Sequence, residues 1–518
     1  MSKYKFTLAF SRFLSLLYGL NFQAKLRPMK SQYHISTTVI IAFILVYIFR
    51  FLTSQFMGIM PQDAYYYFYS EHMALSYFDH PPMVAYMLRI FTAILGKSVG
   101  VIKLANFTVT LLSFWSFYYL SNMFLSKKKA IYATILYGST LLITILSINS
   151  TPDVPLILFW TISVIFIHKA VFENKLYHWI LSGISIGLAF DSKYTALFLL
   201  VSLFTFLIIS KKHRHFLFSI RLALTLLFFA ITISPIVYWN IDNNWISFAF
   251  QTSERATDIG KLLFQPRYLF GNIGTQLVVL LPVLFVGIVF VLYKLARKMI
   301  TTKSLLNDKT NFLLSFSIPL IGFFFAVSFF YWVKMNWIMP GYITMIILAS
   351  VYLGKNILKY QVYTSLVISI LLFVQITFTV VPIKSDGTWF GWPELAENVE
   401  SIIETYPDDF IFSADGYKTS AVLNFYLDST HVYAKNIVGG PGLQFQIIDS
   451  NLTHLIGKNA IFLDSDPRFK DVQKSNSIPE FLYDYFDTVT ELDPIIIQGN
   501  KSVPQRKFLV YRCEGYRR

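Results

Sequence analysis

The sequence predicts a mostly α-helical, polytopic membrane protein that ends in an extracytoplasmic α/β domain. Of its 518 residues, 55% are hydrophobic and only 14% are charged, and the mean hydropathy is +0.53. A soluble fold is rarely so apolar. The net charge of +15 comes from short Lys/Arg clusters between apolar runs. Such clusters are typical of topology signals and of contacts with anionic lipid, so a nucleic-acid partner is not indicated.

Residues 1–35 form a basic segment that we expect to be cytoplasmic. A modest apolar stretch at 6–22 lies among lysines and arginines, with no small-residue cleavage site before the first strong apolar run. This pattern favours an interfacial helix. Alternatively, translation starts at Met29 and the preceding residues are not part of the protein.

Residues 36–383 contain the apolar runs of the predicted membrane domain. A spanning helix needs about 20 mostly apolar residues, which predicts about eleven helices. Their approximate positions are 36–56, 99–122, 130–148, 153–171, 177–192, 194–210, 217–239, 268–293, 311–331, 335–353 and 360–381.

The basic clusters predict the orientation of these helices. The clusters at 127–129, 211–215 and 294–298 fall on the same side as the N-terminal segment, which the positive-inside rule makes cytoplasmic. The same rule explains the run KKHRH at 211–215, so a metal or nucleotide site there is not needed. The loop 57–98 and everything after residue 384 then face the opposite, extracytoplasmic side.

Residues 384–518 read as a separate soluble domain. Short β-type runs (DFIFSAD, HVYA, NAIFLDS, KFLVYRC) alternate with the helix-like YKTSAVLNFYL. We interpret Asp415, Lys418 and Gln444 there as ordinary surface or capping residues. The chain's single cysteine, Cys513, excludes an internal disulfide and a multi-cysteine metal site.

The loop 57–98 carries the first cluster of polar residues. Two amphipathic stretches, Ala64 to Tyr77 and Met83 to Leu95, predict short helices at the membrane surface, separated by FDHPP. The double proline stiffens this corner and fixes Asp79 and His80 on it. A stiff acidic corner suits a phosphate-and-metal site. Ordinary solvated loop residues explain the pattern equally well.

Asp153 in the sequence TPDVPLILFW is the second candidate. It opens a helix on the outer side, where it either caps that helix or faces the same compartment as Asp63 and Asp79. Converging carboxylates would bind Mg²⁺ or Mn²⁺, with Asp63 and Asp153 as the expected ligands. A carboxylate left without metal could act as a general base.

Basic residues on the same side could hold a phosphate. Lys103, Lys193 and Arg255 are the main candidates, because a membrane-level charge such as Lys193 needs a partner unless it snorkels to the interface. Arg267 and Lys334 lie on this side too. The other candidate substrate-binding residues are His80, Gln276, Tyr65 and Tyr66. The sequence contains no P-loop and no G-x-S-x-G elbow, so neither nucleotide hydrolysis nor serine-hydrolase chemistry is indicated.

Several motifs together resemble one enzyme class. They are DAYYYFYSEHMALSYFDHPP, GVIKLANF, TPDVPLILFW, DSKYT, SPIVYWNIDNNWISFAFQ, GWPELA and YKTSAVLNFYL. In this order they resemble the GT-C membrane glycosyltransferases, and within them the dolichyl-phosphate-mannose protein mannosyltransferase superfamily. The chain looks similar to the bacterial lipid A aminoarabinose transferases and related FDHPP-containing enzymes. FDHPP and TPD carry most of the specificity.

The resemblance implies an inverting transfer of a sugar from a polyprenyl-phosphate carrier to an acceptor at the periplasmic face of the inner membrane. Lipid A or another lipopolysaccharide component is the expected acceptor; a protein O-glycosyltransferase is the alternative. A transporter of lipid-linked sugars is less favoured, because its charges should lie near helix midpoints. The family's acidic positions match Gln62-Asp63, Asp79-His80 and Asp153. This chain departs from the pattern at Gln62, which is often acidic, and at His80, where the aminoarabinose enzymes have lysine.

Overall fold

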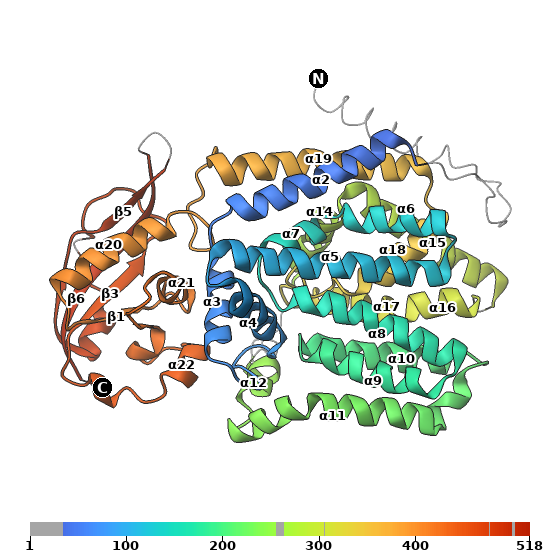
Figure 1. The fold of residues 1–518 in the computed structure, drawn as a ribbon, viewed down its shortest axis with the longest axis horizontal. Helices are drawn as coiled ribbons and strands as arrows, with labels where there is room; N and C mark the ends of the chain where they lie inside the picture. The colour runs from blue at the N-terminus through green and yellow to red at the C-terminus, as the bar shows by residue number, and fades with distance from the viewer. Residues whose placement is uncertain (1–34, 255–263, 305, 476, 500–502, 518) are drawn as a thin grey trace. The chain divides into compact units, whose positions relative to one another are not determined.

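The computed structural model describes residues 35–254, 264–304, 306–475, 477–499 and 503–517, and its helical part confirms a membrane-protein architecture (Figure 1). Within these ranges, six helical segments are long and apolar enough to cross a membrane, or eight if two bent pairs each count as one span. The six are α2 (Thr37–Phe56), α5 (Val99–Phe124), α8 (Asp153–Glu173), α11 (Ile220–Asp242), α16 with α17 (Asp308–Ser315, Ile318–Val327) and α19 (Lys355–Phe378).

All eleven predicted runs are helical, but not all have the length of a span. The bent pairs are α6 with α7 (Lys127–Gly138, Leu141–Ile148), which meet at 62°, and α14 with α15 (Pro266–Leu280, Pro282–Thr302), which meet at 113°. Three further apolar helices are shorter: α9 (Leu176–Phe190), η1 with α10 (Tyr194–Leu197, Phe198–Ile209) and α18 (Gly341–Tyr352). A count of eleven crossings therefore stays a prediction.

The breaks between helices have local causes. Pro282 lacks the N–H that would continue α14, so the chain turns there and α15 starts. At the break between α6 and α7, Arg50 of α2 donates hydrogen bonds to the carbonyls of Gly138 (2.5 Å) and Thr140 (3.0 Å). A buried break in a helix leaves carbonyls unpaired, and this arginine supplies their missing donors.

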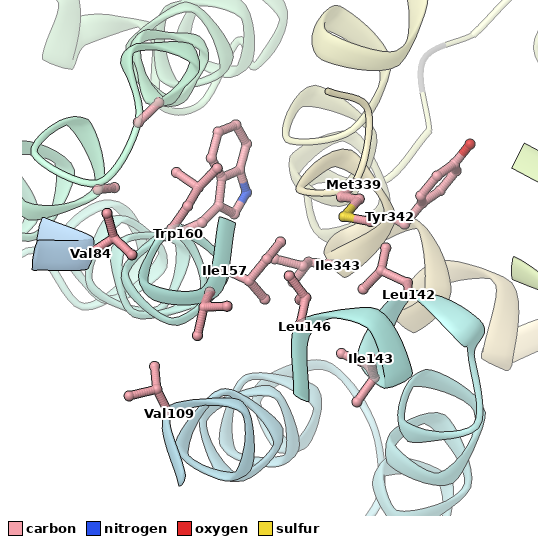
Figure 2. Close-up of a cluster of buried hydrophobic side chains, with 14 of the residues drawn as sticks. Val84, Val109, Leu142, Ile143, Leu146, Ile157, Trp160, Met339, Tyr342 and Ile343 are labelled. Carbon is pink, nitrogen blue, oxygen red and sulfur yellow. The ribbon is translucent and has the colours of Figure 1, made fainter. Parts of the chain in front are cut away.

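The helices pack around a hydrophobic core of aliphatic and aromatic side chains. Helix α2 runs along α19, α8 along α9, and α9 along α11. Side chains of α4, α5, α7, α8 and α18 meet in the interior shown in Figure 2, where Trp160 lies near Ile157 and Val84. Val109, Leu142, Ile143, Leu146, Met339, Tyr342 and Ile343 complete the labelled set, and all of these residues are buried.

The loop 57–98 contains the two short helices that the sequence predicted. They are α3 (Pro61–Glu71) and α4 (Met83–Leu95). Helix α3 ends before the predicted Tyr77, and residues 72–82 have irregular structure up to the double proline. Farther along the chain, η2 (Arg214–Phe218) precedes α11, and α12 (Ile246–Ala249) with the π-helical turn η3 (Phe250–Glu254) follows it.

The C-terminal part contains a six-stranded mixed sheet in the order β2-β1-β3-β6-β4, with β5 also paired to β6. Strand β1 is parallel to β2 and β3, and β6 is antiparallel to β3, β4 and β5. The strands are β1 (Phe410–Ser413), β2 (Val432–Tyr433), β3 (Ala460–Ser465), β4 (Phe486–Glu491), β5 (Ile495–Gln498) and β6 (Pro504–Tyr516). The helices are α20 (Trp392–Thr405), α21 (Lys418–Tyr426), η4 (Lys435–Val438), α22 (Gln444–Ile448), η5 (Thr453–Leu455) and η6 (Glu480–Asp484).

One face of this sheet is an aromatic core. The register aligns Phe412 with Phe462 and Phe462 with Tyr511, and their ring centroids lie 4.8 and 5.9 Å apart. Cross-strand aromatic pairs of this kind stabilise a sheet. Cys513 is buried in the same cluster, and burial raises the pKa of its thiol to about 12. The predicted α/β character of this region is confirmed.

Candidate active site

Four sequence segments that are far apart in the chain meet near the FDHPP corner. The Met83 N–H donates to the Asp191 carbonyl at 3.0 Å, which ties the corner to the DSKYT junction. The Tyr194 hydroxyl lies 3.4 Å from Ser76 Oγ and 2.7 Å from Ser247 Oγ. Gln251 then donates its side-chain amide to the Asp79 carbonyl. Residues 76–83, 191–195 and 247–251 thus form one connected network, and Lys193 adds the TPD motif to it.

Asp79 is held by tyrosine hydroxyls. Tyr65 and Tyr69 stand one turn apart on α3 and therefore project from the same face. Both donate to Asp79 Oδ1, Tyr65 at 3.0 Å. Burial, and then the nearby Asp79 carboxylate, raise the pKa of both tyrosines well above its ordinary value. They remain protonated donors at any physiological pH. His80 lies beside the carboxylate, with Nε2 3.9 Å from Oδ2.

Two residues of the C-terminal part reach this corner, which the sequence did not indicate. Gln444 Oε1 accepts a hydrogen bond from the Phe78 N–H at 2.9 Å, and the Gln444 N–H donates to the Tyr65 hydroxyl at 3.2 Å. The ring of Tyr417 stacks on Tyr65 with centroids 4.2 Å apart. Gln444 is only 3% exposed, so its interpretation as a surface or capping residue is wrong.

Asp415 and Lys418, in contrast, have the ordinary roles expected of them. Asp415 accepts hydrogen bonds from the Thr419 N–H at 3.2 Å and from the Thr419 hydroxyl at 2.7 Å, at the start of α21. The Lys418 ammonium lies 3.8 Å from Asp386. Neither contact involves the FDHPP corner. No local pattern separates these two residues from Gln444, because the contact partners of Gln444 lie more than 360 positions away in the sequence.

Asp153 and Lys193 form the second part of the site. The Lys193 ammonium donates to both carboxylate oxygens, at 2.8 and 3.0 Å, and both side chains are largely buried. Asn336 adds a hydrogen bond to Asp153 Oδ2 at 2.6 Å. The start of α8 and the start of η1 are therefore joined by an ion pair. Sequence reasoning did not find Asn336, which follows the exposed Lys334 in an irregular stretch between α17 and α18.

Asp63 and Lys103 form a comparable pair that is sealed from solvent. Lys103 Nζ lies 2.5 Å from Asp63 Oδ2 and 2.7 Å from the Ile148 carbonyl, and both side chains are 0% exposed. The Ser150 and Met60 N–H groups also donate to Asp63, at 2.7 and 3.0 Å. Every oxygen of this carboxylate is engaged. The pair connects α3, α5 and the turn before α8.

The carboxylates fit a metal ion poorly. The described residues contain no group of three or more His, Cys, Asp or Glu side chains placed to share an ion. Asp63 and Asp153, the expected ligands, are each neutralised by a lysine instead. A hard cation needs oxygen ligands whose charge is not already balanced. The metal therefore stays a prediction, and no chemical step below depends on it.

The remaining candidates lie in different surroundings. Tyr66 packs against Tyr69, with ring centroids 5.5 Å apart, and its ring centroid lies 6.1 Å from that of His80. Gln62 lies close to the Tyr417 hydroxyl. Gln276 is buried on α14, where it bonds to Tyr342 at 3.1 Å, so it joins α14 to α18.

The other basic residues that the sequence predicted are Arg255, Arg267 and Lys334. Arg255 lies outside the described residues. Arg267 is exposed and rests on the ring of Tyr268. Lys334 is exposed near Asn336 in the sequence.

Comparison with known proteins supports the class that these features define. The model of the dolichyl-phosphate-mannose-protein mannosyltransferase family matches residues 79–239, which begin at Asp79 and include the TPD and DSKYT motifs. No curated protein sequence matches the chain.

Three solved structures share the fold. ArnT from Cupriavidus metallidurans in the apo state is 12% identical, with a TM-score of 0.61 over 92% of this chain and 97% of that one. ArnT bound to undecaprenyl phosphate gives a TM-score of 0.60 at 12% identity, with 92% and 98% covered. The Archaeoglobus fulgidus oligosaccharyltransferase, complexed with Zn and sulfate, gives 0.50 at 12% identity over 83% of this chain and 68% of that one.

The fold and the matched segment define a membrane glycosyltransferase of the GT-C type, as the sequence predicted. Within that class, residues 79–239 relate the chain to the dolichyl-phosphate-mannose-protein mannosyltransferases.

Proposed function

We propose that this enzyme transfers a sugar from a polyprenyl-phosphate carrier to lipid A or another lipopolysaccharide component, at the periplasmic face of the inner membrane. The observation that carries the proposal is the single network that joins Asp79, its two tyrosine donors and the Asp153–Lys193 pair. The network combines a carboxylate that can accept a proton, Asp79, with an ammonium group that can interact with phosphate, Lys193. The ArnT structure that shares this fold was determined with undecaprenyl phosphate.

Asp79 is the general base in this proposal. The acceptor oxygen forms a bond to the anomeric carbon while the bond from that carbon to the phosphate oxygen breaks, so the configuration inverts. The acceptor proton passes to Asp79. Tyr65 and Tyr69 fix the orientation of the carboxylate, and its second oxygen is directed toward His80. Asp63 is less suited to this role, because all its oxygens are engaged in a fully buried environment.

Lys193 supports the leaving group in this proposal. The departing lipid phosphate gains negative charge as the glycosidic bond breaks, and a pre-positioned ammonium stabilises that charge. Asp153, which also accepts a hydrogen bond from Asn336, holds Lys193 in place, so little reorganisation is required during the reaction. Arg255 remains a second candidate for the phosphate from the sequence.

Mass spectrometry of lipid A and whole lipopolysaccharide tests the proposal. The native host is compared with and without the gene, and complemented with the wild type, Asp79→Asn or Asp63→Asn. We expect one glycosyl unit to disappear without the gene and to return with the wild type but not with Asp79→Asn. Unchanged lipopolysaccharide in all strains rejects this acceptor and points to envelope glycoproteins. Full rescue by Asp79→Asn removes Asp79 from the chemistry.

A further inference from the structure

Helix α3 presents two sets of side chains to its surroundings, and only one set contacts Asp79. Tyr65 and Tyr69 project toward that carboxylate. Ala64, Phe68 and His72 follow each other at intervals of four, with Tyr67 and Glu71 between them, so they form a separate stripe on the helix. This second stripe lines a groove of about 460 Å³.

The opposite wall of the groove comes from the C-terminal part. It consists of one side of α21, with Ala421, Asn424 and Phe425, and of the following turn, residues 427–431. Lys97 closes one end: its ammonium lies 2.6 Å from Asp428 and above the ring of Phe425, at 5.2 Å from the centroid. The volume falls in the usual range for a small-ligand site.

The lining combines aromatic rings with many hydrogen-bonding groups. Tyr67, Phe68 and Phe425 supply the rings, of which only a small part, 4–5%, is exposed. Carboxylates, an ammonium, imidazoles and hydroxyls from Glu71, Asp428, Lys97, His72, His431, Ser429 and Thr430 supply donors and acceptors. Closely spaced donors and acceptors beside a small apolar surface match a sugar, because a pyranose carries hydroxyls along its edge and C–H groups on its face.

The charges in the groove exclude a phosphate-recognition site. Its fixed charges are two carboxylates, Glu71 and Asp428, against one ammonium, Lys97. Arg89, which is not among the lining residues, pairs with Glu71 at 3.1 Å and brings the local net charge to about zero. Phosphate binding requires an excess of positive charge. An uncharged, polyhydroxylated ligand fits this balance better.

We infer that this groove between α3 and α21 binds a saccharide portion of the acceptor, away from its phosphates. The inference rests on the proposed function for the identity of the acceptor, but not for the presence of a sugar site. In this arrangement, α3 binds the acceptor glycan with one face and holds Asp79 with the other. The C-terminal part then contributes to acceptor choice.

Binding of a defined oligosaccharide tests the inference. The probe is the dephosphorylated core oligosaccharide of the host's lipopolysaccharide, titrated against the full protein in lipid nanodiscs by saturation-transfer difference NMR. Ser429→Trp fills the groove from an exposed position. Ser450→Trp is the matched control, because Ser450 is also exposed but lines a different depression. Glu71→Gln keeps the shape of the groove and removes one charge.

The expected result is binding by the wild type and by Ser450→Trp, its loss in Ser429→Trp, and affinity about tenfold lower in Glu71→Gln, as for the loss of one charged hydrogen bond. Binding that survives in Ser429→Trp overturns the inference, as does binding of only the phosphorylated oligosaccharide. Undecaprenyl phosphate binding is measured on the same samples. If that binding and lipopolysaccharide transfer are intact while the oligosaccharide does not bind, the groove assignment fails and the proposed function stands.

Discussion

The two buried aspartates that open α3 and α8 differ from the aspartate of the FDHPP corner in what neutralises them. Asp63 and Asp153 each face a lysine ammonium, at 2.5 and 2.8 Å. Asp79 faces two tyrosine hydroxyls and a histidine. A lysine ammonium cancels the charge of the carboxylate that it contacts, whereas a neutral hydroxyl orients the carboxylate without cancelling its charge. The Asp63–Lys103 pair, which is sealed from solvent, therefore has a structural role. The proposed function assigns proton transfer to Asp79 and phosphate binding to Lys193.

Replacing Asp79 by Asn should have the largest effect. The amide keeps the shape of the side chain but cannot take a proton, and loss of a general base lowers rates by about 10²–10⁴-fold. We expect transfer to fall by this factor, with a change in thermal stability of only a few degrees. The measurement is glycosyl transfer to lipopolysaccharide in membranes of the host lacking the gene. Transfer within threefold of wild type would mean that another group accepts the proton.

Replacing Lys103 by Met should instead destabilise the protein. Removal of one partner of a buried pair leaves an uncompensated charge and costs about 3–5 kcal/mol. The double variant Asp63→Asn/Lys103→Met should recover most of that loss, because no charge is then left alone. Thermal denaturation in mild detergent measures the stability of the single and the double variant. If the single and double variants are equally unstable, Lys103 acts through packing and not through charge.

Replacing Gln444 by Leu should weaken activity by about tenfold. The side chain loses its hydrogen bond to the Phe78 N–H, which is worth about 1–1.5 kcal/mol and fixes the residue before Asp79. The Gln444 backbone bond to Tyr65 remains. We expect kcat to fall more than KM rises, because the change disturbs the position of Asp79 and not the binding of substrate. The control is Lys418→Leu, because Lys418 lies in the same part of the chain and pairs with Asp386. This variant should change neither kcat nor KM.

The architecture of this chain was readable from its sequence to a large extent, because hydropathy and strand periodicity are local signals. The apolar helices, the two helices beside FDHPP, α21 and the strands β1, β2, β3 and β6 were predicted, whereas α12, α20 and α22 were not. Strands β4 and β5 were missed, since both pair only with the long β6 and carry weak patterns of their own.

The site was readable only in part. Asp79, Asp153 and Lys193 were found because charges beside apolar runs stand out. The pairing of Asp63 with Lys103, and the roles of Asn336 and Gln444, depend on contacts across 40 to more than 360 residues. No spacing rule predicts such contacts. Sequence alone also could not tell that lysines balance the carboxylates expected to hold a metal.

The smallest expected effect concerns Asp464 in the C-terminal sheet. Its surroundings differ from those of Asp63, Asp153 and Asp79, because its neighbours include other carboxylates. Burial first, and then the like-charged Asp415, Asp466 and Asp386, raise its pKa from the ordinary 3.8 to about 6. Between pH 3.8 and about 6, Asp464 therefore binds its proton more tightly in the folded protein than in the unfolded chain. Its stabilising contribution is complete below pH 3.8 and is lost as the pH rises through 6.

Asp464→Asn should therefore stabilise the protein at pH 7.5, by about 1 kcal/mol after allowance for solvent screening, and should change little at pH 4. Thermal denaturation at the two pH values measures this difference. Asp471→Asn, an exposed position whose carboxylate lies 3.5 Å from Lys507, is the control and should not stabilise at pH 7.5. A loss of stability in Asp464→Asn at pH 7.5 would show that this carboxylate is balanced by a cation, as Asp63 and Asp153 are, and that buried acids throughout the chain follow one rule.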